Sequence, residues 1–358
     1  MSTETRLYVA VGVLAVLGGG LYLQMKGNKE EAAKYTQEGR AAELPDVSFT
    51  EDTIGKVDKI VVKKAADGDG GAATEVELTK EGENWKLTKP VSYAANQANV
   101  KSLLDAMKRL KTSELISKST DQYERFGVAD GKGLHVVISA GGETKADLRF
   151  GEGGSRGQMA RIGGQEGVFT IKNYSSFTFD RDMKGWRDLA ILKFEDADVE
   201  AVELTNEHGE YSFAKASGAW TVKYKKPKAL AAGKIDGFEP SKVDELLRAY
   251  KALNAADFGD GKQASEVGLD PARATLTVKQ KDGKPTHVIT VGDKADGSNV
   301  WLKVSGSDQI FQISSWAAEW ATAEPTKFTG AKAEGGGEPA MGGLPEGFDL
   351  EALGGMGH

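Results

Sequence analysis

The chain of 358 residues contains no cysteine. It therefore forms no disulfide bond, no thiolate nucleophile, no thiolate-bound zinc site and no lipid-modified cysteine of the lipoprotein type. It also lacks an excess of basic residues, because the formal net charge is -7 and the isoelectric point is about 5.4. Proteins that bind nucleic acid need basic groups that displace the counterions of the phosphate backbone. We therefore expect no nucleic-acid partner.

Sequence motifs of common chemistries are also missing. The four histidines stand singly, without H-x-H or H-E-x-x-H spacing, and no G-x-S-x-G serine elbow occurs. The glycine-rich stretch LRFGEGGSRGQ at residues 148–158 is followed by a second strand-like run. A phosphate-binding loop leads into a helix instead, so we predict a hairpin here. We predict no metal site, no cofactor and no catalytic residue, identify no small-molecule substrate, and expect a protein that is not an enzyme.

One long apolar run lies near the amino terminus. Residues 7–25 carry no charge, and their length matches a helix that crosses a bilayer core of about 30 Å. A cleaved signal peptide is the alternative, but no A-x-A site follows and the run exceeds a usual signal core, so we predict an uncleaved transmembrane helix. Arg6 precedes the run and Lys26 and Lys29 follow it, which by itself favours a cytoplasmic carboxyl side. Long domains translocate largely regardless of charge, so we predict residues 1–6 in the cytoplasm and the bulk of the chain in the periplasm, anchored in a bacterial inner membrane.

Two polar segments flank the central part of the chain. Residues 26–48 are rich in Lys, Glu and Ala and are predicted to be a stalk. Residues 329–358 are rich in Gly, Pro, Ala and Glu, a composition typical of a disordered tail. Within the tail, four apolar residues alternate with acidic ones, as in a peptide that orders on a partner: Leu344, Phe348, Leu350 and Leu353. A passive tail is the alternative interpretation.

The central part repeats one pattern twice. NWKLTKP at residues 84–90 parallels AWTVKYKKP at 219–227, and each segment places a tryptophan before a lysine-proline pair. VKSLLDAMKRL at 100–110 parallels VDELLRAYKAL at 243–253, and both carry apolar residues on one face of a 3.6-residue period. Further along, Gly151 in LRFGE corresponds to Gly292 in ITVGD. An internal repeat of this kind predicts two similar folded parts.

This order of elements predicts an α+β fold. We expect an N-terminal transmembrane helix followed by two homologous repeats, residues 49–190 and 196–328. Each repeat is predicted to be a mainly antiparallel sheet covered by an amphipathic helix.

Four tryptophans are predicted to lie in the cores of these repeats. Trp85 and Trp220 precede an apolar residue two positions on, which places both side chains on one face of a strand. Trp316 and Trp320 are four residues apart, which places them on one face of a helix. We therefore interpret all four as core residues and not as a ligand cage.

A basic segment in the second repeat is the main candidate for contact with a partner. It comprises Lys223, Tyr224, Lys225, Lys226 and Lys228, and its counterpart in the first repeat, KLTKP, is less basic. Docking to an acidic partner or to anionic lipid headgroups is one interpretation. The other is a solvated strand end.

The duplicated motifs, over residues 49–328, resemble an uncharacterised bacterial family of domains of unknown function with one N-terminal membrane helix and tandem α+β repeats. Members of that family are often encoded beside gliding-motility-type ABC transporter components, and no catalytic residues are established for it. The resemblance implies a membrane-anchored extracytoplasmic binding or scaffolding subunit that accompanies an ABC-type export system, with permease components as its membrane-protein partner. The alternative is an anchored extracytoplasmic enzyme acting on a cell-envelope polymer.

Overall fold

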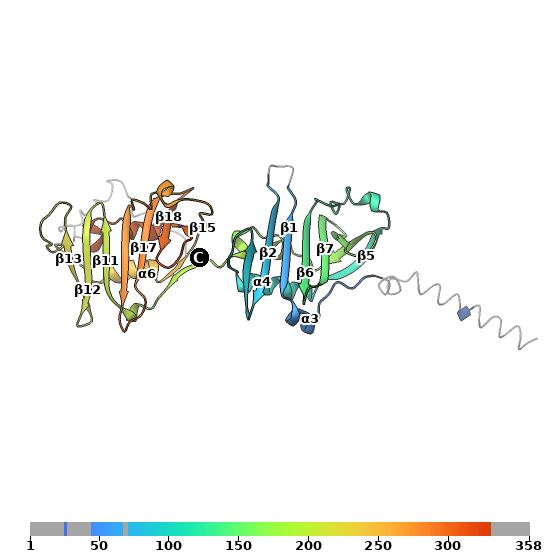
Figure 1. The fold of residues 1–358 in the computed structure, drawn as a ribbon, viewed down its shortest axis with the longest axis horizontal. Helices are drawn as coiled ribbons and strands as arrows, with labels where there is room; N and C mark the ends of the chain where they lie inside the picture. The colour runs from blue at the N-terminus through green and yellow to red at the C-terminus, as the bar shows by residue number, and fades with distance from the viewer. Residues whose placement is uncertain (1–24, 27–43, 67–70, 331–358) are drawn as a thin grey trace, which may run out of the picture. The chain divides into compact units, whose positions relative to one another are not determined.

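The computed structural model describes residues 25–26, 44–66 and 71–330 (Figure 1). The predicted membrane segment 7–25, apart from its last residue, and the predicted tail motif at 344–353 lie outside the described residues. Within the described residues, no helix has both the length and the apolar character needed to cross a membrane. The chain divides into two compact units, one ending at Leu189 and the other beginning at Ala190.

Unit 1 is built around a nine-stranded antiparallel sheet with the order β4-β3-β2-β1-β6-β7-β8-β9-β5. Its strands are β1 (Lys59–Lys64), β2 (Thr74–Glu81), β3 (Asn84–Lys89), β4 (Tyr93–Ala94), β5 (Lys111–Ser117), β6 (Leu134–Ala140), β7 (Glu143–Gly154), β8 (Gly157–Ile162) and β9 (Val168–Lys172). Its helices are α3 (Glu51–Lys56), α4 (Gln97–Met107) and α5 (Ser176–Phe179), with short 3-10 turns η1 (Thr120–Gln122) and η2 (Lys184–Trp186).

Unit 2 is built around an eight-stranded antiparallel sheet with the order β13-β12-β11-β16-β17-β18-β19-β15. Its strands are β11 (Val199–Asn206), β12 (Gly209–Ala216), β13 (Ala219–Lys225), β15 (Asp257–Phe258), β16 (Ala274–Gln280), β17 (His287–Lys294), β18 (Asn299–Val304) and β19 (Ile310–Ser314). A separate pair joins β10 (Ala190–Lys193) to β14 (Ala252–Asn254). Its helices are α6 (Ser241–Tyr250) and α7 (Ser315–Ala321), with 3-10 turns η3 (Asp196–Asp198), η4 (Ala264–Val267) and η5 (Pro325–Phe328).

The two sheets have corresponding strand orders. Read from β3 to β5 and from β13 to β15, each sheet begins with three consecutive strands in reverse chain order. Four further consecutive strands follow, and one strand from the segment after the helix, β5 or β15, closes the edge. Figure 1 shows the same succession of antiparallel strands in each unit. Because of this correspondence, each strand from β3 to β5 has a topological counterpart in the sheet of unit 2.

The predicted α+β class is wrong, because the described chain is mainly β and its units are not helix-covered repeats. The longest helix among the described residues of unit 1, α4, has 11 residues, which amounts to about 16 Å of helix. A sheet of nine strands spaced by about 4.8 Å is more than twice as wide. One such helix cannot cover the sheet. Much of the burial comes from the strands themselves, and in β9 four successive residues, from Val168 to Ile171, are all buried.

The predicted apolar stripes of the two helices are nevertheless confirmed. The buried residues of α4 are Val100, Leu103, Leu104, Ala106 and Met107, and those of α6 are Val243, Leu246, Leu247, Ala249 and Tyr250. In unit 1 these side chains belong to one apolar cluster with residues of β1, β2, β3, β6, β7, β8 and β9. Each helix therefore adds its stripe to a core that is made mainly by strands.

Three of the four tryptophans predicted to be in the core are buried. Trp85 is 8% exposed, Trp220 is 4% exposed and Trp320 is 5% exposed. The prediction for Trp316 is wrong, because its side chain is 55% exposed. Trp316 is the second residue of the seven-residue helix α7. The buried residues of α7 are Ala317, Ala318, Trp320 and Ala321, so Trp316 lies outside the face that packs on the core.

The glycine-rich stretch at 148–158 forms the predicted hairpin, in which β7 pairs with β8. Gly151 of β7 lies so close to the preceding turn that an added Cβ would be 2.0 Å from the carbonyl oxygen of Phe126. Its counterpart Gly292 lies against the equivalent turn of unit 2, with 2.3 Å to the carbonyl oxygen of Val267. No side chain fits at either position, which explains the glycine in both parts of the repeated pattern.

Candidate functional site

The basic segment predicted as a docking surface lies at the end of β13. Lys223, Lys226 and Lys228 are exposed, and Lys225 is half-buried and pairs with Glu210 at 3.1 Å. Tyr224 points the other way into the core. Its hydroxyl donates a hydrogen bond to the carbonyl of His208 at 2.6 Å, and its ring centroid lies 4.8 Å from that of Tyr211. Only the lysines therefore face solvent.

The strand that carries these lysines is an edge of its sheet. β13 pairs with β12 on one side, and on its other side a single bridge joins Tyr224 to Gly233. The main chain of Tyr224 points away from β12, because its N–H donates to Gly233 at 3.0 Å and its carbonyl accepts from Gly233 at 2.7 Å. In an antiparallel pair this orientation alternates, so the N–H and C=O groups of Val222 and Trp220 point the same way. Among the described residues no strand pairs with them.

The corresponding edge of unit 1 is closed. β4 pairs with β3 there, with Tyr93 opposite Leu87. The side chain of Gln97 accepts a hydrogen bond from the N–H of Trp85 and donates one to its carbonyl, both at 2.8 Å. In unit 2 the repeated pattern places Pro240, the residue before α6, where unit 1 has Gln97, and proline has no side-chain amide to do this. The main chain of Trp85 and Leu87 thus has partners at this edge of unit 1, whereas the N–H and C=O groups of their counterparts on β13, Trp220 and Val222, have none among the described residues. An edge strand with available N–H and C=O groups can accept an added strand.

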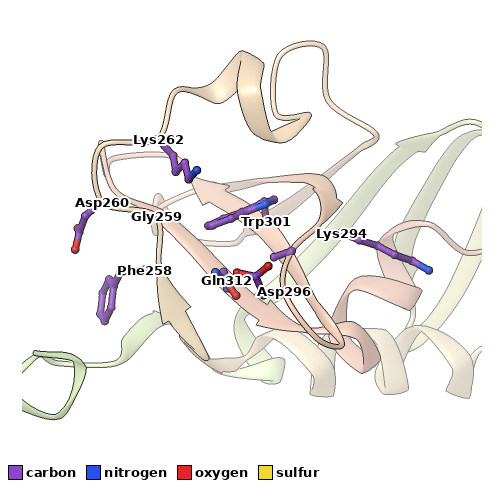
Figure 2. A pocket seen from close by; sticks show the side chains of 9 residues that line it. Phe258, Gly259, Asp260, Lys262, Lys294, Asp296, Trp301 and Gln312 are labelled. Carbon is purple, nitrogen blue, oxygen red and sulfur yellow. The ribbon is translucent and has the colours of Figure 1, made fainter. Parts of the chain in front are cut away.

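A second candidate site is an open hollow of about 430 Å³ in unit 2 (Figure 2). We call it the Trp301 hollow, and its lining residues are Phe258, Gly259, Asp260, Lys262, Lys294, Ala295, Asp296, Trp301 and Gln312. It lies where the β17–β18 hairpin and the loop after β15 meet the outer face of β18 and β19. In Figure 2, Trp301 lies across the middle of the hollow, with Lys262 above it and Gln312 and Asp296 below it.

The sheet itself positions the central side chains of this hollow. Trp301 of β18 stands opposite Gln312 of β19, so both side chains lie on the same face. Gln312 is only 8% exposed, and its Oε1 accepts a hydrogen bond from the Nδ2 of Asn299 at 3.1 Å. An added Cβ on Gly259 would be 2.9 Å from the ring of Trp301. The absence of a side chain at Gly259 thus lets the loop lie against the indole.

Sequence reasoning missed this hollow. The only available signal was the comparison of the two halves, in which Met159 and Thr170 of unit 1 stand where unit 2 has Trp301 and Gln312. Unit 2 thus has a large aromatic residue and an amide where unit 1 has smaller side chains, which indicates a function specific to unit 2.

The histidines do not form a common site. His135 bonds to Asp147 at 2.7 Å. His287 accepts a hydrogen bond from Gln280 at 3.1 Å, and burial lowers its pKa. In the described part of the chain, no group of three or more His, Cys, Asp or Glu residues could hold a metal ion. The fourth histidine, His358, lies outside it.

A charged cluster on the outer face of the unit 1 sheet is internally paired. Arg149 and Arg161 both contact Asp130, at 3.1 and 2.7 Å, and these arginines stand opposite each other on β7 and β8. The hydrogen bond and charge of Arg161 lower the pKa of Asp130. Asp147, whose charge also acts on Arg149, balances the second arginine, so this cluster stabilises the sheet face and offers no clear ligand position.

The fold and these sites define a class of protein made of two antiparallel β-sheet units. Residues 85–272, just over half of the chain, match the profile of a family described as Domain of unknown function (DUF4340). The chain belongs to this family, and the prediction of an uncharacterised domain family is confirmed. Neither curated proteins nor solved structures gave a match. The matched region includes β13 but ends before Trp301 and Gln312.

Proposed function

We propose that this chain is a membrane-anchored extracytoplasmic binding or scaffolding subunit that accompanies an ABC-type export system of the gliding-motility kind. The apolar segment 7–25 supplies the anchor, and the two β units form the part that binds. Permease components of the export system are the proposed partner. The observation that carries the binding role is the open edge of β13 with its row of lysines.

The edge of β13 has the chemistry of a strand-addition site. An extended partner segment would pair with the main chain of Trp220 and Val222, and each hydrogen bond formed contributes about 1 kcal/mol. Its alternate side chains would meet Lys223 and Lys225 on the outer face. The surface therefore selects an extended segment with acidic residues at alternate positions.

The alternative function, an anchored enzyme acting on a cell-envelope polymer, has less support. Asp260 and Asp296 both line the Trp301 hollow. In Figure 2, Asp296 lies below Trp301, whereas Asp260 points outward from the loop. Glycoside hydrolysis needs two carboxyl groups that flank one bond. The hollow therefore fits binding better than catalysis.

A proline substitution tests the strand-addition surface. Val222→Pro removes an N–H that points away from β12, so the ladder with β12 is kept while a partner strand is blocked. The full chain would be purified with mild detergent from native membranes, and co-purified ABC permease and ATPase subunits would be quantified by mass spectrometry. We expect these subunits with the parent chain and their loss from Val222→Pro at an unchanged melting temperature.

Two controls complete this experiment. Thr221→Pro removes an N–H that faces β12 and should lower the melting temperature. Lys86→Glu lies on β3, which β4 covers at the corresponding edge of unit 1, and should leave co-purification unchanged. Equal recovery of the transporter subunits with the parent and Val222→Pro would refute the role of the edge. Their absence from the parent preparation would refute the proposed partner.

Added protease tests the proposed location. In spheroplasts, protease should digest the chain beyond residue 26, because the bulk of the chain is proposed to be periplasmic. Protection of that part would reverse the orientation and agree with the positions of Lys26 and Lys29.

A further inference from the structure

The indole of Trp301 forms a partly exposed aromatic platform. The residue is half-buried and packs against a small apolar cluster of Val267, Leu269 and Ile310. Within the described residues its indole N–H makes no hydrogen bond, and no other aromatic ring stacks on it. An indole that packs on this cluster and is open to a hollow can offer its π face to C–H groups of a ligand. Its N–H can donate a hydrogen bond to an acceptor on the ligand.

Gln312 supplies a polar group that the protein leaves unused. The residue is more than nine-tenths buried, and its Oε1 is occupied by Asn299. Its Nε2 makes no hydrogen bond to any described residue, and the side chain lines the hollow. This Nε2 is not one of the side-chain atoms that are fully shielded from solvent without a partner, so it opens into the hollow, where a water molecule or a ligand can accept its hydrogen bond.

The remaining polar groups of the hollow balance in charge. Lys262 and Asp296 lie on opposite sides of Trp301 in Figure 2, and neither forms an ion pair with a described residue. The outward-pointing pair, Asp260 and Lys294, also sums to zero formal charge. The lining thus provides donors and an acceptor without a net formal charge, which disfavours a strongly charged ligand.

The positions of unit 1 that correspond to Trp301 and Gln312 have neither an indole nor an amide. Thr170, the counterpart of Gln312, is completely buried, and its hydroxyl bonds to that of Ser113 at 2.8 Å. Met159 replaces the indole. The fold therefore does not require an aromatic platform or an open amide here, and unit 2 carries both for another reason.

From this combination we infer that the Trp301 hollow binds a short, uncharged saccharide. The apolar face of a sugar ring stacks on the indole, while its hydroxyls, which both donate and accept, bond to Gln312, Asp296 and Lys262. The volume of about 430 Å³ lies within the range of small-molecule sites, about 300–1,000 Å³. The site is separate from the edge of β13 and does not depend on the proposed partner.

Saturation-transfer NMR and titration calorimetry with defined sugars test the inference. The full chain would be held in lauryldimethylamine oxide, because a glycoside detergent would compete for the site. The probes are chitotriose, maltotriose and cellotriose. We expect at least one to bind with ring C–H protons receiving saturation, and Trp301→Ala to weaken its binding about tenfold or more.

Further variants separate loss of the site from loss of the fold. Gln312→Leu and Lys262→Ala retain the indole and should each weaken binding severalfold at an unchanged melting temperature. Trp316→Ala removes an exposed tryptophan outside the hollow and should leave binding unchanged, as should Val222→Pro. The inference is overturned if none of the three sugars binds the parent at about 10 mM. Binding that is unchanged in Gln312→Leu and Lys262→Ala also overturns it.

Discussion

Substitution of Gly151 by alanine should break the contact between β7 and the turn before β6. The new Cβ would lie 2.0 Å from the carbonyl oxygen of Phe126 and 2.8 Å from the carbonyl carbon of Gly127. Real Cβ contacts essentially never fall below 3.0 Å, so the two main chains must separate by about 1 Å. The carbonyl of Phe126 also accepts a hydrogen bond from the N–H of Glu152 at 3.1 Å, and the separation would break it.

The cost follows from these two changes. Overpacking of a rigid contact costs about 1–3 kcal/mol, and the lost hydrogen bond adds about 1 kcal/mol. A destabilisation of about 2–4 kcal/mol lowers the melting temperature of a unit of this size by about 4–16 °C. Gly292→Ala should have a similar effect on unit 2, where the added Cβ would be 2.3 Å from the carbonyl oxygen of Val267.

The assay is thermal unfolding of the full chain, followed by near-ultraviolet circular dichroism in the same detergent for all variants. Gly154→Ala is the matched control, because it lies in the same hairpin and no atom lies within 4 Å of its added Cβ. It should melt within about 2 °C of the parent. If Gly151→Ala also melted like the parent, the close approach of strand and turn, and with it the reason for the repeated glycine, would be refuted.

Three further predictions concern stability. Trp220→Ala and Trp85→Ala should each lower the free energy of unfolding by about 3–5 kcal/mol, whereas Trp316→Ala should lower it by less than about 0.5 kcal/mol. Equal losses for the three variants in calorimetry would contradict the assigned burial. Gln97→Ala should destabilise unit 1 by about 1–3 kcal/mol, because the N–H of Trp85 loses its partner there, whereas its carbonyl keeps the hydrogen bond from the N–H of Ala95 at 3.2 Å; chemical denaturation would measure this loss. Burial lowers the pKa of His287 in the folded chain below the unfolded value of 6.5; its contribution is therefore complete above about pH 6.5 and is lost as the pH falls. His287→Phe should flatten the decline of the melting temperature between about pH 7 and pH 5, and an unchanged slope would contradict this assignment.

Local periodicity identified the elements that lie within short windows of sequence. The apolar spacing from Val100 to Met107 predicted a helix face that is buried, and the tryptophan two residues before an apolar residue predicted the buried side of β3 and β13. The hairpin at 148–158 was also predictable, because a turn and its two flanking strands are contiguous.

Long-range pairing explains what periodicity could not identify. β5 follows α4 in the chain yet pairs with β9, more than fifty residues later, and β15 pairs with β19 in the same way. These long-range pairings widen each sheet and make the fold mainly β. The number of strands and helices predicted from the sequence did not show this. The Trp301 hollow depends on the same long-range closure, since Gln312 is brought beside the loop at Gly259 by the pairing of β15 with β19.

The strand order also shows whether the residues that match the family could fold as a separate fragment. The match begins at Trp85, inside β3, and ends at residue 272, before β16. A fragment cut at those points would lack β1 and β2, which occupy the middle of the first sheet, and would lack β16 to β19 of the second. Two half-sheets with unpaired inner edges would aggregate rather than fold. The bounds of the matched region, residues 85–272, therefore do not coincide with the bounds of the folded units. Fragments for crystallisation or partner screening should be cut at the junction between Leu189 and Ala190.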